Sequence, residues 1–291
     1  MLSLYFRETR PQFLLLTPVC VLVGAGAAFW QAGAINAVYL AVAFWGALAA
    51  HVAVNVLNDY FDFQSGLDLR TIPTPFSGGS GILPAKQISP PAALRFGLAS
   101  LGVTIAVGIY FFLVRGGGIL LVGLPGLLLV VLYTRYLTRF PLLCLLAPGL
   151  GFGPCMVLGT YYVLRGFYDW TTVAASLIPG FLVSNLLLLN QFPDVEADRR
   201  AGRRHLPVVL GKSRCARIYS LLALTTYLWL ILATSIGLLP YPTLLALLPL
   251  PLAIKTIRDV QRHAELIPLL GQNVLLTLAT PFLLAVGFLL S

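Results

Sequence analysis

Nine apolar stretches dominate this chain and limit what it can fold into. They lie at roughly 13–33, 36–57, 93–114, 118–136, 142–163, 171–191, 217–236, 239–255 and 266–289. A helix of about 20 residues crosses the hydrocarbon layer of a bilayer, and inside that layer a helix satisfies its own backbone groups. The sequence therefore predicts an all-α integral membrane protein with nine transmembrane helices. The eighth stretch contains prolines that favour kinks, namely Pro240, Pro242, Pro249 and Pro251.

The composition leaves little room for anything besides these helices. The 291 residues are 58% hydrophobic and 10% charged, which excludes an ordinary soluble domain. Two connecting loops are long, at about 58–92 and 192–216, and both follow helices that end on the same side of the membrane. We expect a single transmembrane domain over residues 1–291, with two loosely similar four-helix halves and a ninth helix.

The basic residues support this topology. If the N-terminus and the loops after the second, fourth, sixth and eighth helices share one side, 17 of the 19 Lys and Arg residues fall there. Only Arg115 and Arg165 fall on the other side. Because Lys and Arg collect in cytoplasmic loops, we expect the N-terminus and both long loops to be cytoplasmic, in a bacterial or archaeal cytoplasmic membrane. The net charge of +9 then reflects topology and attraction to anionic lipid or substrate, not nucleic-acid binding.

The N-terminus and the cysteines predict neither a removed signal peptide nor a disulfide framework or zinc site. Glu8 lies between Arg7 and Arg10, and no small-residue cleavage site follows the first apolar stretch. No CxxC pair occurs among the cysteines, which are Cys20, Cys144, Cys155 and Cys215. We therefore expect a retained cytoplasmic N-terminus.

Six of the ten acidic residues lie in two short windows. In the first window, the second helix continues through Asn58, Asp59 and Asp62. Asn58 and Asp62 are then i,i+4 neighbours on one helical face. A turn is expected at Gly66, which precedes Asp68. The window therefore predicts a group of oxygen ligands at the end of a membrane helix.

The second window has the same spacing of Asn and Asp residues. Asn190, Asp194 and Asp198 are spaced by four, which predicts one stripe along a helix. Carboxylates at the end of a membrane helix are costly without a cation, and Mg²⁺ is typically held by one or two carboxylates together with substrate phosphates. The two windows predict Mg²⁺ between protein and a diphosphate. For one isolated acid, pairing with a neighbouring Arg is the better interpretation, but the pattern occurs twice.

Basic residues of the same loops are candidates for the remaining diphosphate oxygens, with Arg as a bidentate fork and Lys as a point charge. Arg70 and Lys86 share the first loop with the acids, and further candidates are Arg139, Arg203, Arg204 and Lys212. The glycine-rich stretch 76–81 offers backbone N–H groups to an anion or forms a lid, without a known phosphate-loop pattern.

Histidines and tyrosines give weaker signals. His51 is expected to be a hydrogen-bonded core residue, and His205 and His263 are expected in loops. Tyr161 and Tyr162 stand together near the end of the fifth helix, where an interfacial anchor and a place in the pocket are both open.

Together, the two windows resemble the paired Asp-rich motifs of the UbiA superfamily of intramembrane aromatic prenyltransferases. The resemblance is carried by Asn58-Asp59-Tyr60-Phe61-Asp62 with Gly66-x-Asp68, and by Asn190-x3-Asp194-x3-Asp198 with Gly202. The chain length, the nine helices and Arg10-Pro11 at the start of the first helix match as well, so the resemblance covers essentially the whole chain.

Within that family the chain looks most like the branch that makes menaquinone precursors, the 1,4-dihydroxy-2-naphthoate polyprenyltransferases. The form of both motifs and the run from Phe152 to Tyr162 carry this likeness. That branch usually has an acid before the run, where Pro148-Gly149-Leu150-Gly151 has none. A lipid, 4-hydroxybenzoate and homogentisate therefore stay open as acceptors.

The resemblance implies Mg²⁺-dependent transfer of a polyprenyl group from an allylic polyprenyl diphosphate to an aromatic ring, with loss of CO₂ when the acceptor is the naphthoate. The implied metal ligands are Asp59, Asp62, Asp68, Asp194 and Asp198. The implied catalytic residues are Asp62, Asp194, Lys86, Arg139, Tyr161 and Tyr162. The implied substrate-binding residues are Arg10, Asn58, Arg70, Asn190 and Lys212.

A secondary transporter of an anionic substrate is the competing class, because transporters also have repeated halves and polar groups in membrane helices. A transporter site is expected near the middle of the bilayer. The acids of this chain lie instead at one membrane edge, on two loops. This placement favours the enzyme.

Overall fold

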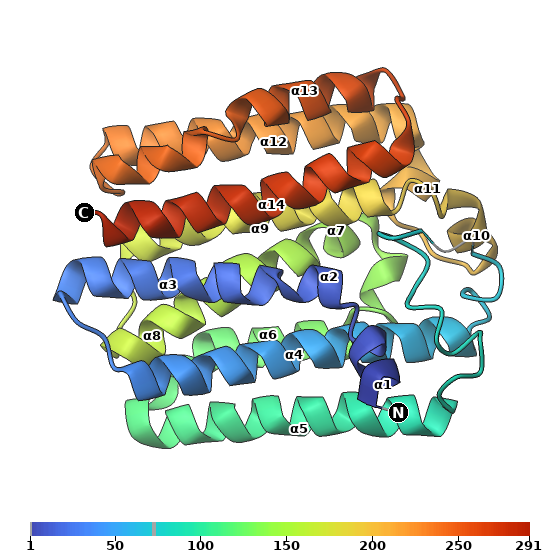
Figure 1. Ribbon diagram of the computed structural model, residues 1–291, viewed down its shortest axis with the longest axis horizontal. Helices are drawn as coiled ribbons and strands as arrows, with labels where there is room; N and C mark the ends of the chain where they lie inside the picture. Colours follow the sequence, from blue (N-terminus) through green and yellow to red (C-terminus); the bar gives the residue numbers. More distant parts are fainter. Residues whose placement is uncertain (1, 72–73) are drawn as a thin grey trace.

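A computed structural model describes residues 2–71 and 74–291 of the chain. Positions 72 and 73, within the predicted loop 58–92, lie outside the described residues, as does position 1. The described residues are mainly helical and contain no β-strand. Their helices run side by side in one bundle (Figure 1), as the sequence predicts.

The elements follow one another along the chain with short connections, apart from the loops around residues 65–89 and 191–211. Their bounds are α1 (Leu2–Glu8), α2 (Pro11–Leu14), α3 (Leu16–Ala32), α4 (Ala37–Gln64), α5 (Pro90–Arg115), η1 (Gly117–Ile119), α6 (Leu120–Leu132), η2 (Leu137–Arg139), α7 (Pro141–Leu150), the π-helical η3 (Gly151–Leu158), α8 (Gly159–Arg165), α9 (Trp170–Asn190), α10 (Val195–Arg200), α11 (Leu206–Leu210), α12 (Lys212–Ser235), η4 (Tyr241–Leu247), α13 (Leu250–Gln261) and α14 (Leu266–Leu289).

Among the described residues, seven helices are long and apolar enough to cross a membrane. They are Pro11–Ala32, Ala37–Gln64, Pro90–Arg115, Pro141–Arg165, Trp170–Asn190, Lys212–Ser235 and Leu266–Leu289. The other two predicted crossings correspond to shorter elements. One is the apolar helix Gly117–Leu132, and the other is divided into η4 and α13. Pro249 and Pro251 lie at this division, where the missing N–H groups prevent a continuous helix.

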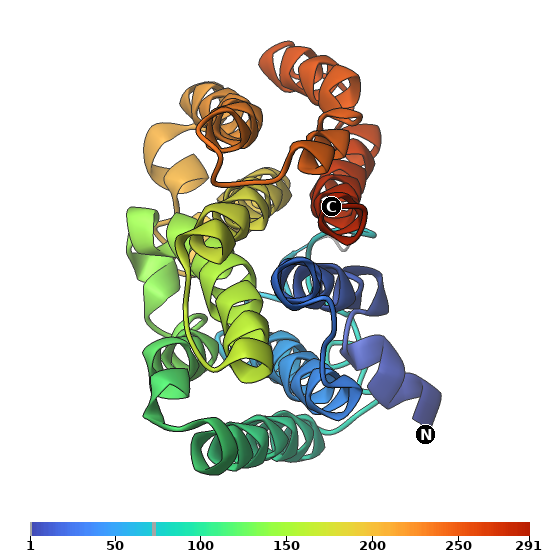
Figure 2. The same cartoon turned by 90° about the vertical axis from the view of Figure 1, so that its left-hand side faces the viewer.

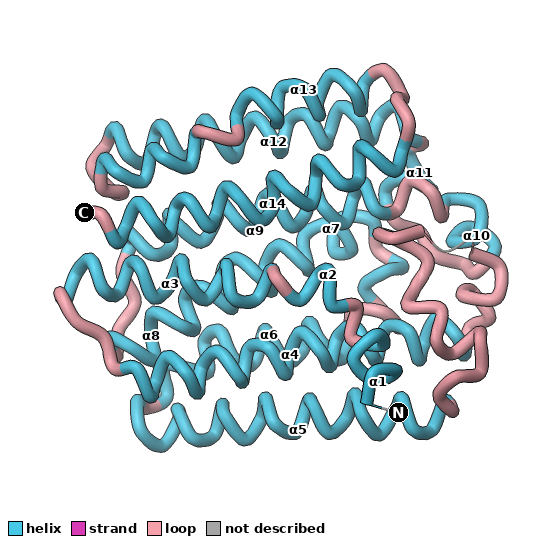
Figure 3. The backbone as a smooth tube through the Cα atoms, in the orientation of Figure 1, coloured by secondary structure: helices cyan, strands magenta, loops and turns pink. Residues whose placement is uncertain are grey.

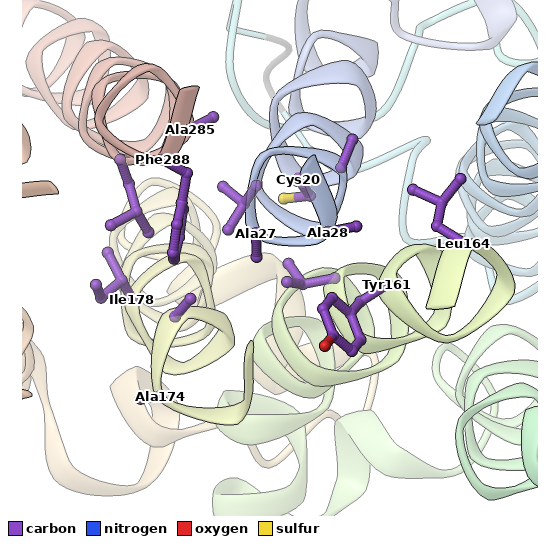
Figure 4. Packing of buried hydrophobic residues seen from close by; sticks show 14 of the residues in the cluster. Cys20, Ala27, Ala28, Tyr161, Leu164, Ala174, Ile178, Ala285 and Phe288 are labelled. Atoms are coloured by element: carbon purple, nitrogen blue, oxygen red, sulfur yellow. The ribbon is translucent and has the colours of Figure 1, made fainter. Parts of the chain in front are cut away.

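Small residues let the central helices approach closely. α3 packs along α14 and against α8, and α9 packs against η3, α7 and α12. Figure 4 shows the core between these helices, where Ala27 and Ala285 lie near Phe288. Association of membrane helices depends on such van der Waals contact, because lipid is as apolar as the side chains.

The two motif loops lie at the same end of the bundle. The loop after α4 and the segment containing α10 and α11 meet at the end opposite the α3–α4 and α8–α9 connections (Figure 3). Figure 2, which looks along the bundle, shows the long helices arranged around a common interior. The fold therefore brings two acidic windows that are separated by more than 100 residues to one place.

Gly153 offers a test of this packing, because a Cβ atom there would lie 2.5 Å from the backbone oxygen of Ser176 and 2.8 Å from the Cα atom of Gly180. We expect Gly153→Ala to lower the free energy of unfolding by about 1–3 kcal/mol, the usual cost of overpacking. Unfolding in detergent followed by circular dichroism measures the loss.

Gly102→Ala is the matched control, because a Cβ atom at Gly102 meets no other atom within 4 Å. Equal stability of the two variants would contradict the close packing of η3 on α9.

Candidate active site

A cavity of about 400 Å³ reaches the loop end and extends between α4, α5, α6, η3 and α9. Polar side chains line its outer part, including Arg10, Asn55, Asn58, Asp62, Asp68, Asn190, Asp194, Asp198, Arg203 and His205. Apolar side chains line its inner part, including Val107, Phe111, Ile119, Val122, Phe152 and Val163. The cavity thus joins a charged chamber to an apolar arm.

The first motif is positioned by the end of α4 and by one turn. Asn58, Asp59 and Asp62 all lie on α4, which confirms that the second helix continues through the motif. Gly66 has φ 73°, a left-handed conformation that favours glycine, and the next N–H, of Leu67, donates to the backbone oxygen of Asp62 at 3.0 Å. This helix cap brings Asp68 back to the cavity.

The second motif differs from the predicted stripe. α9 ends at Asn190, and Pro193 precedes α10, whose N-cap residue is Asp194. The prediction of one continuous helical stripe is therefore wrong. The helix is interrupted because Pro193 has no N–H group and its ring clashes with the preceding turn. Asn190, Asp194 and Asp198 nevertheless line the same cavity.

α10 ends with the same kind of turn as α4. Gly202 has φ 78°, and the N–H of Arg203 donates to the backbone oxygen of Asp198 at 3.0 Å. In each motif an aspartate is followed four residues later by a left-handed glycine. In the second motif the turn directs Arg203 into the cavity.

Arg203 joins the two motifs. Its guanidinium forms ion pairs with Asp62 of α4 and with Asp198 of α10, at 3.1 Å from Asp198 Oδ1. Burial disfavours the charged guanidinium, but Asp62 and Asp198 outweigh this effect and raise the pKa of Arg203. His205 Nε2 lies 2.7 Å from Asp198 Oδ2 and completes the cluster.

Arg10 holds the first motif from the other side. It forms an ion pair with Asp59 and donates to Asn58 Oδ1 at 3.1 Å. The backbone N–H of Ser80 donates to Asp59 Oδ2 at 2.9 Å, which ties the glycine-rich loop to α4. Gly79 in that loop has φ 75°, and a Cβ atom there would lie 3.0 Å from Asp68 Oδ2. The loop therefore needs glycine to approach Asp68.

The site has more buried carboxylates than cations. Burial, followed by repulsion from Asp62 and Asp59, raises the pKa of Asp68 to about 8. Burial, followed by repulsion from Asp198, raises the pKa of Asp194 to about 7. The side-chain oxygen of Asn190 is buried and has no hydrogen-bond partner among the described residues. These oxygens are therefore available to a cation.

The carboxylates that line the cavity suit Mg²⁺ that takes some of its ligands from a substrate. No three His, Cys, Asp or Glu side chains in the described part of the chain form a group that could hold a metal ion by themselves. The carboxylates instead face one cavity from two motifs. Mg²⁺ commonly uses only one or two carboxylates and takes its other oxygens from water and substrate phosphates. The residues fit a metal that binds together with a diphosphate.

Several basic residues predicted from the sequence lie apart from this cavity. Arg70, Lys86 and Lys212 are exposed and do not line it. Arg139 lies in η2 and lines a neighbouring groove. Arg10, by contrast, contacts the first motif directly. The structure therefore brings one of these five predicted basic residues to the acidic cluster.

The paired tyrosines also lie elsewhere. Tyr161 and Tyr162 are buried in α8, near the end of the bundle opposite the motif loops (Figure 1). The hydroxyl of Tyr161 donates to Gln31, and that of Tyr162 donates to the backbone oxygen of Arg115 at 2.8 Å. Figure 4 shows Tyr161 within the core. Neither side chain lines the cavity.

Two histidines, His51 and His205, line the main cavity. His51 is a buried, hydrogen-bonded core residue, as predicted, with Nδ1 at 2.8 Å from Thr17 Oγ1, and it also lines the cavity. His205 lies in the loop before α11, as predicted, and it is also buried against Asp198. Arg203 was a candidate for the diphosphate oxygens, but its ion pairs with Asp62 and Asp198 were not predicted. Its signal was the glycine before it, at the spacing found after Asp62.

Comparisons with known proteins agree with this arrangement. The sequence model of the UbiA prenyltransferase family matches residues 17–266. A 1,4-dihydroxy-2-naphthoate octaprenyltransferase from Bacillus subtilis is 26% identical over 79% of this chain and 73% of its own length. Another from Mycobacterium tuberculosis is 29% identical over 90% and 88%. A solved structure of a UbiA homolog from Archaeoglobus fulgidus, bound to DMAPP and Mg²⁺, superimposes with a TM-score of 0.70 at 15% identity, covering 97% of this chain and 99% of that one.

Arg203 provides a stability test, because its removal leaves two buried carboxylates without their cation. We expect Arg203→Gln to lower the free energy of unfolding of the metal-free protein by about 3–5 kcal/mol, the usual cost of breaking a buried ion pair. Arg199→Gln is the control, since Arg199 pairs with Glu196 at the surface, where the two side chains are 53% and 70% exposed. That change is expected to cost less than about 1 kcal/mol. Equal losses in detergent unfolding would show that the Arg203 pairs do not hold the motifs together.

Proposed function

The chain belongs to the UbiA prenyltransferase family, and from this membership we propose that it transfers a polyprenyl group to 1,4-dihydroxy-2-naphthoate in menaquinone biosynthesis. The donor is an allylic polyprenyl diphosphate, and the reaction depends on Mg²⁺. The relatives from Bacillus subtilis and Mycobacterium tuberculosis carry the name of this activity, and the Archaeoglobus homolog is bound to DMAPP and Mg²⁺.

One observation carries the proposal. Carboxylates of two motifs face a single cavity, and that cavity continues into an apolar arm. The charged chamber suits a diphosphate with its metal ions, whereas the apolar arm suits a hydrocarbon tail. A polyprenyl diphosphate combines these two parts in one molecule.

The residues of the charged chamber have separate tasks in this proposal. Asp62 and Asp68 would hold Mg²⁺ on one side, and Asp194 and Asp198 on the other, with Asp59 fixed by Arg10. Mg²⁺, when bound, supplies positive charge that stabilises the departing diphosphate. Arg10 retains a buried Nε–H without a partner in the described residues, which leaves a donor for an anionic substrate group.

The inner part of the cavity protects the reactive carbon. When the carbon–oxygen bond to diphosphate breaks, the electron pair leaves with the diphosphate and an allylic cation remains. Phe13, Phe76, Phe111 and Phe152 line the cavity, so aromatic faces stabilise the cation and exclude water. An electron-rich ring carbon of the acceptor then forms the new carbon–carbon bond, and the naphthoate loses its carboxylate as CO₂.

The topology predicted from the sequence belongs to the same proposal. Nine membrane crossings, with η4 and α13 together forming the eighth, leave the N-terminus and both motif loops in the cytoplasm. The charge asymmetry of the loops supports this orientation in a bacterial or archaeal cytoplasmic membrane. A water-soluble acceptor would then reach the site from the cytoplasm.

The test incubates membranes that contain the protein with a polyprenyl diphosphate, Mg²⁺ and one acceptor at a time: dihydroxynaphthoate, 4-hydroxybenzoate or homogentisate. We expect prenylated product and released CO₂ with the naphthoate. Asp194→Asn should reduce that rate by roughly 10²–10³-fold, the size expected when one electrostatic stabiliser of the transition state is lost.

Glu196→Gln is the matched control. Glu196 lies two residues from Asp194, but its side chain is 70% exposed and pairs with Arg199 outside the cavity. Its activity should stay within about twofold of the unaltered chain. Full activity of Asp194→Asn would refute the metal assignment, and product with another acceptor alone would refute the naphthoate.

A further inference from the structure

A second cavity, of about 390 Å³, adjoins the first at the loop end. We call it the arginine groove, and its polar lining residues are Tyr60, Asp62, Gln64, Ser65, Thr134, Arg135, Thr138, Arg139 and Arg203. They come from the end of α4, from the α6–η2 turn and from the segment after α10. The groove therefore lies where three loops of the same end meet.

The charge of the arginine groove is positive. Its lining includes three arginines and one acidic residue, Asp62, which is paired with Arg203. Arg135 and Arg139 are exposed, and neither forms an ion pair with another described residue. Unpaired guanidinium groups beside amide and hydroxyl groups favour an anion with several oxygens.

The groove and the main cavity share a wall. Asp62, Thr138 and Arg203 line both. Asn58 of the main cavity donates from Nδ2 to the hydroxyl of Thr134 in the groove at 3.0 Å. The backbone N–H of Arg204 donates to the backbone oxygen of Thr138 at 3.2 Å. The wall between the two cavities therefore consists of side chains from the end of α4 and of the segments around residues 134–138 and 203–204.

The proposed reaction releases a product that needs a polar route out of the main cavity. Each turnover releases inorganic diphosphate, a multiply charged anion, inside a cavity whose inner arm is apolar. An anion cannot leave through hydrocarbon at reasonable cost. It requires a route lined by cations and open to water. Arg203 contacts both cavities, so a diphosphate moving across the wall stays beside a guanidinium group.

We propose that the arginine groove is a second diphosphate site, through which the inorganic diphosphate product leaves the main cavity. The proposal rests on the proposed function, which supplies the product. Arg135 and Arg139 bind the anion on the outer side of the wall, and Arg203 serves both sides. Diphosphate in the groove therefore binds while a prenyl diphosphate occupies the main cavity.

Simultaneous binding gives a kinetic signature. Inorganic diphosphate is added to the full-length enzyme at constant free Mg²⁺, and the concentration of the prenyl diphosphate is varied. We expect mixed inhibition, with a competitive component from the main cavity and a noncompetitive component from the groove. In Arg135→Gln/Arg139→Gln the noncompetitive inhibition constant should rise at least tenfold, while competitive inhibition remains.

Two further variants sharpen the test. Arg199→Gln/Arg200→Gln removes the same charge from exposed positions on α10 that do not line the groove, and its inhibition constants should stay within twofold. Gln64→Glu adds a carboxylate to the groove without removing an arginine, and it should also weaken the noncompetitive component. This variant carries the test if the double arginine variant does not fold.

Two inhibition results would overturn the proposal while prenyl transfer proceeds normally. One is purely competitive inhibition of the unaltered enzyme. The other is a noncompetitive component that persists in both groove variants. A rise in only the KM for the prenyl diphosphate would assign the groove to substrate uptake and would also overturn it. Absence of any prenylated product would instead refute the proposed function.

Discussion

The site depends on one electrostatic constraint, the burial of aspartates at the end of membrane helices. Asp62 and Asp198 are buried, and the pKa of Asp194 is raised to about 7 chiefly by burial. Two arginines reduce this cost, Arg10 within the first motif and Arg203 between the motifs. They do not match all the carboxylates, so the cluster keeps more carboxylates than cations. A protein that only needed stability would lose nothing by replacing such a cluster with apolar residues. The cluster is therefore best understood as a binding site that the folded bundle keeps in an incompletely neutralised state.

Much of this arrangement could be predicted because it is local in sequence. Apolar stretches of about 20 residues indicate membrane helices. Each of the predicted crossings corresponds to a helical segment of the structure. The spacing of Asn58 and Asp62 fixes their common face once α4 continues through them. The left-handed turn at Gly66 follows from the same reasoning, since glycine adopts that conformation without steric cost. The meeting of the two motif loops followed from counting crossings, which places both at one end of the bundle.

The remaining features depend on contacts between distant segments. The spacing of Gly202 after Asp198 distinguishes Arg203 from the neighbouring arginines, but it does not identify the partner of Arg203, Asp62, which lies 141 positions away. Tyr161 and Tyr162 carry suitable side chains, but the packing of α8 turns both hydroxyls to partners outside the cavity. Whether a proline lies within a helix or ends it could be predicted only in part from the sequence. Pro148 and Pro154 lie inside helical segments, whereas Pro193 separates two helices. A proline is tolerated inside a membrane helix when neighbouring helices satisfy the backbone groups that it leaves free, and this depends on tertiary contacts.

The role of the two motifs in holding metal and diphosphate can be tested by a structure of the protein with Mn²⁺ and a non-reactive thio analogue of a polyprenyl diphosphate. Anomalous scattering from manganese would locate the metal without reference to activity. We expect manganese between the diphosphate and the carboxylates of both motifs, with Asp62 or Asp68 on one side and Asp194 or Asp198 on the other. The hydrocarbon tail should lie in the apolar arm beside Phe111. Manganese bound away from these carboxylates, or a diphosphate bound in the cavity without metal, would show that the two motifs do not form a metal–diphosphate site.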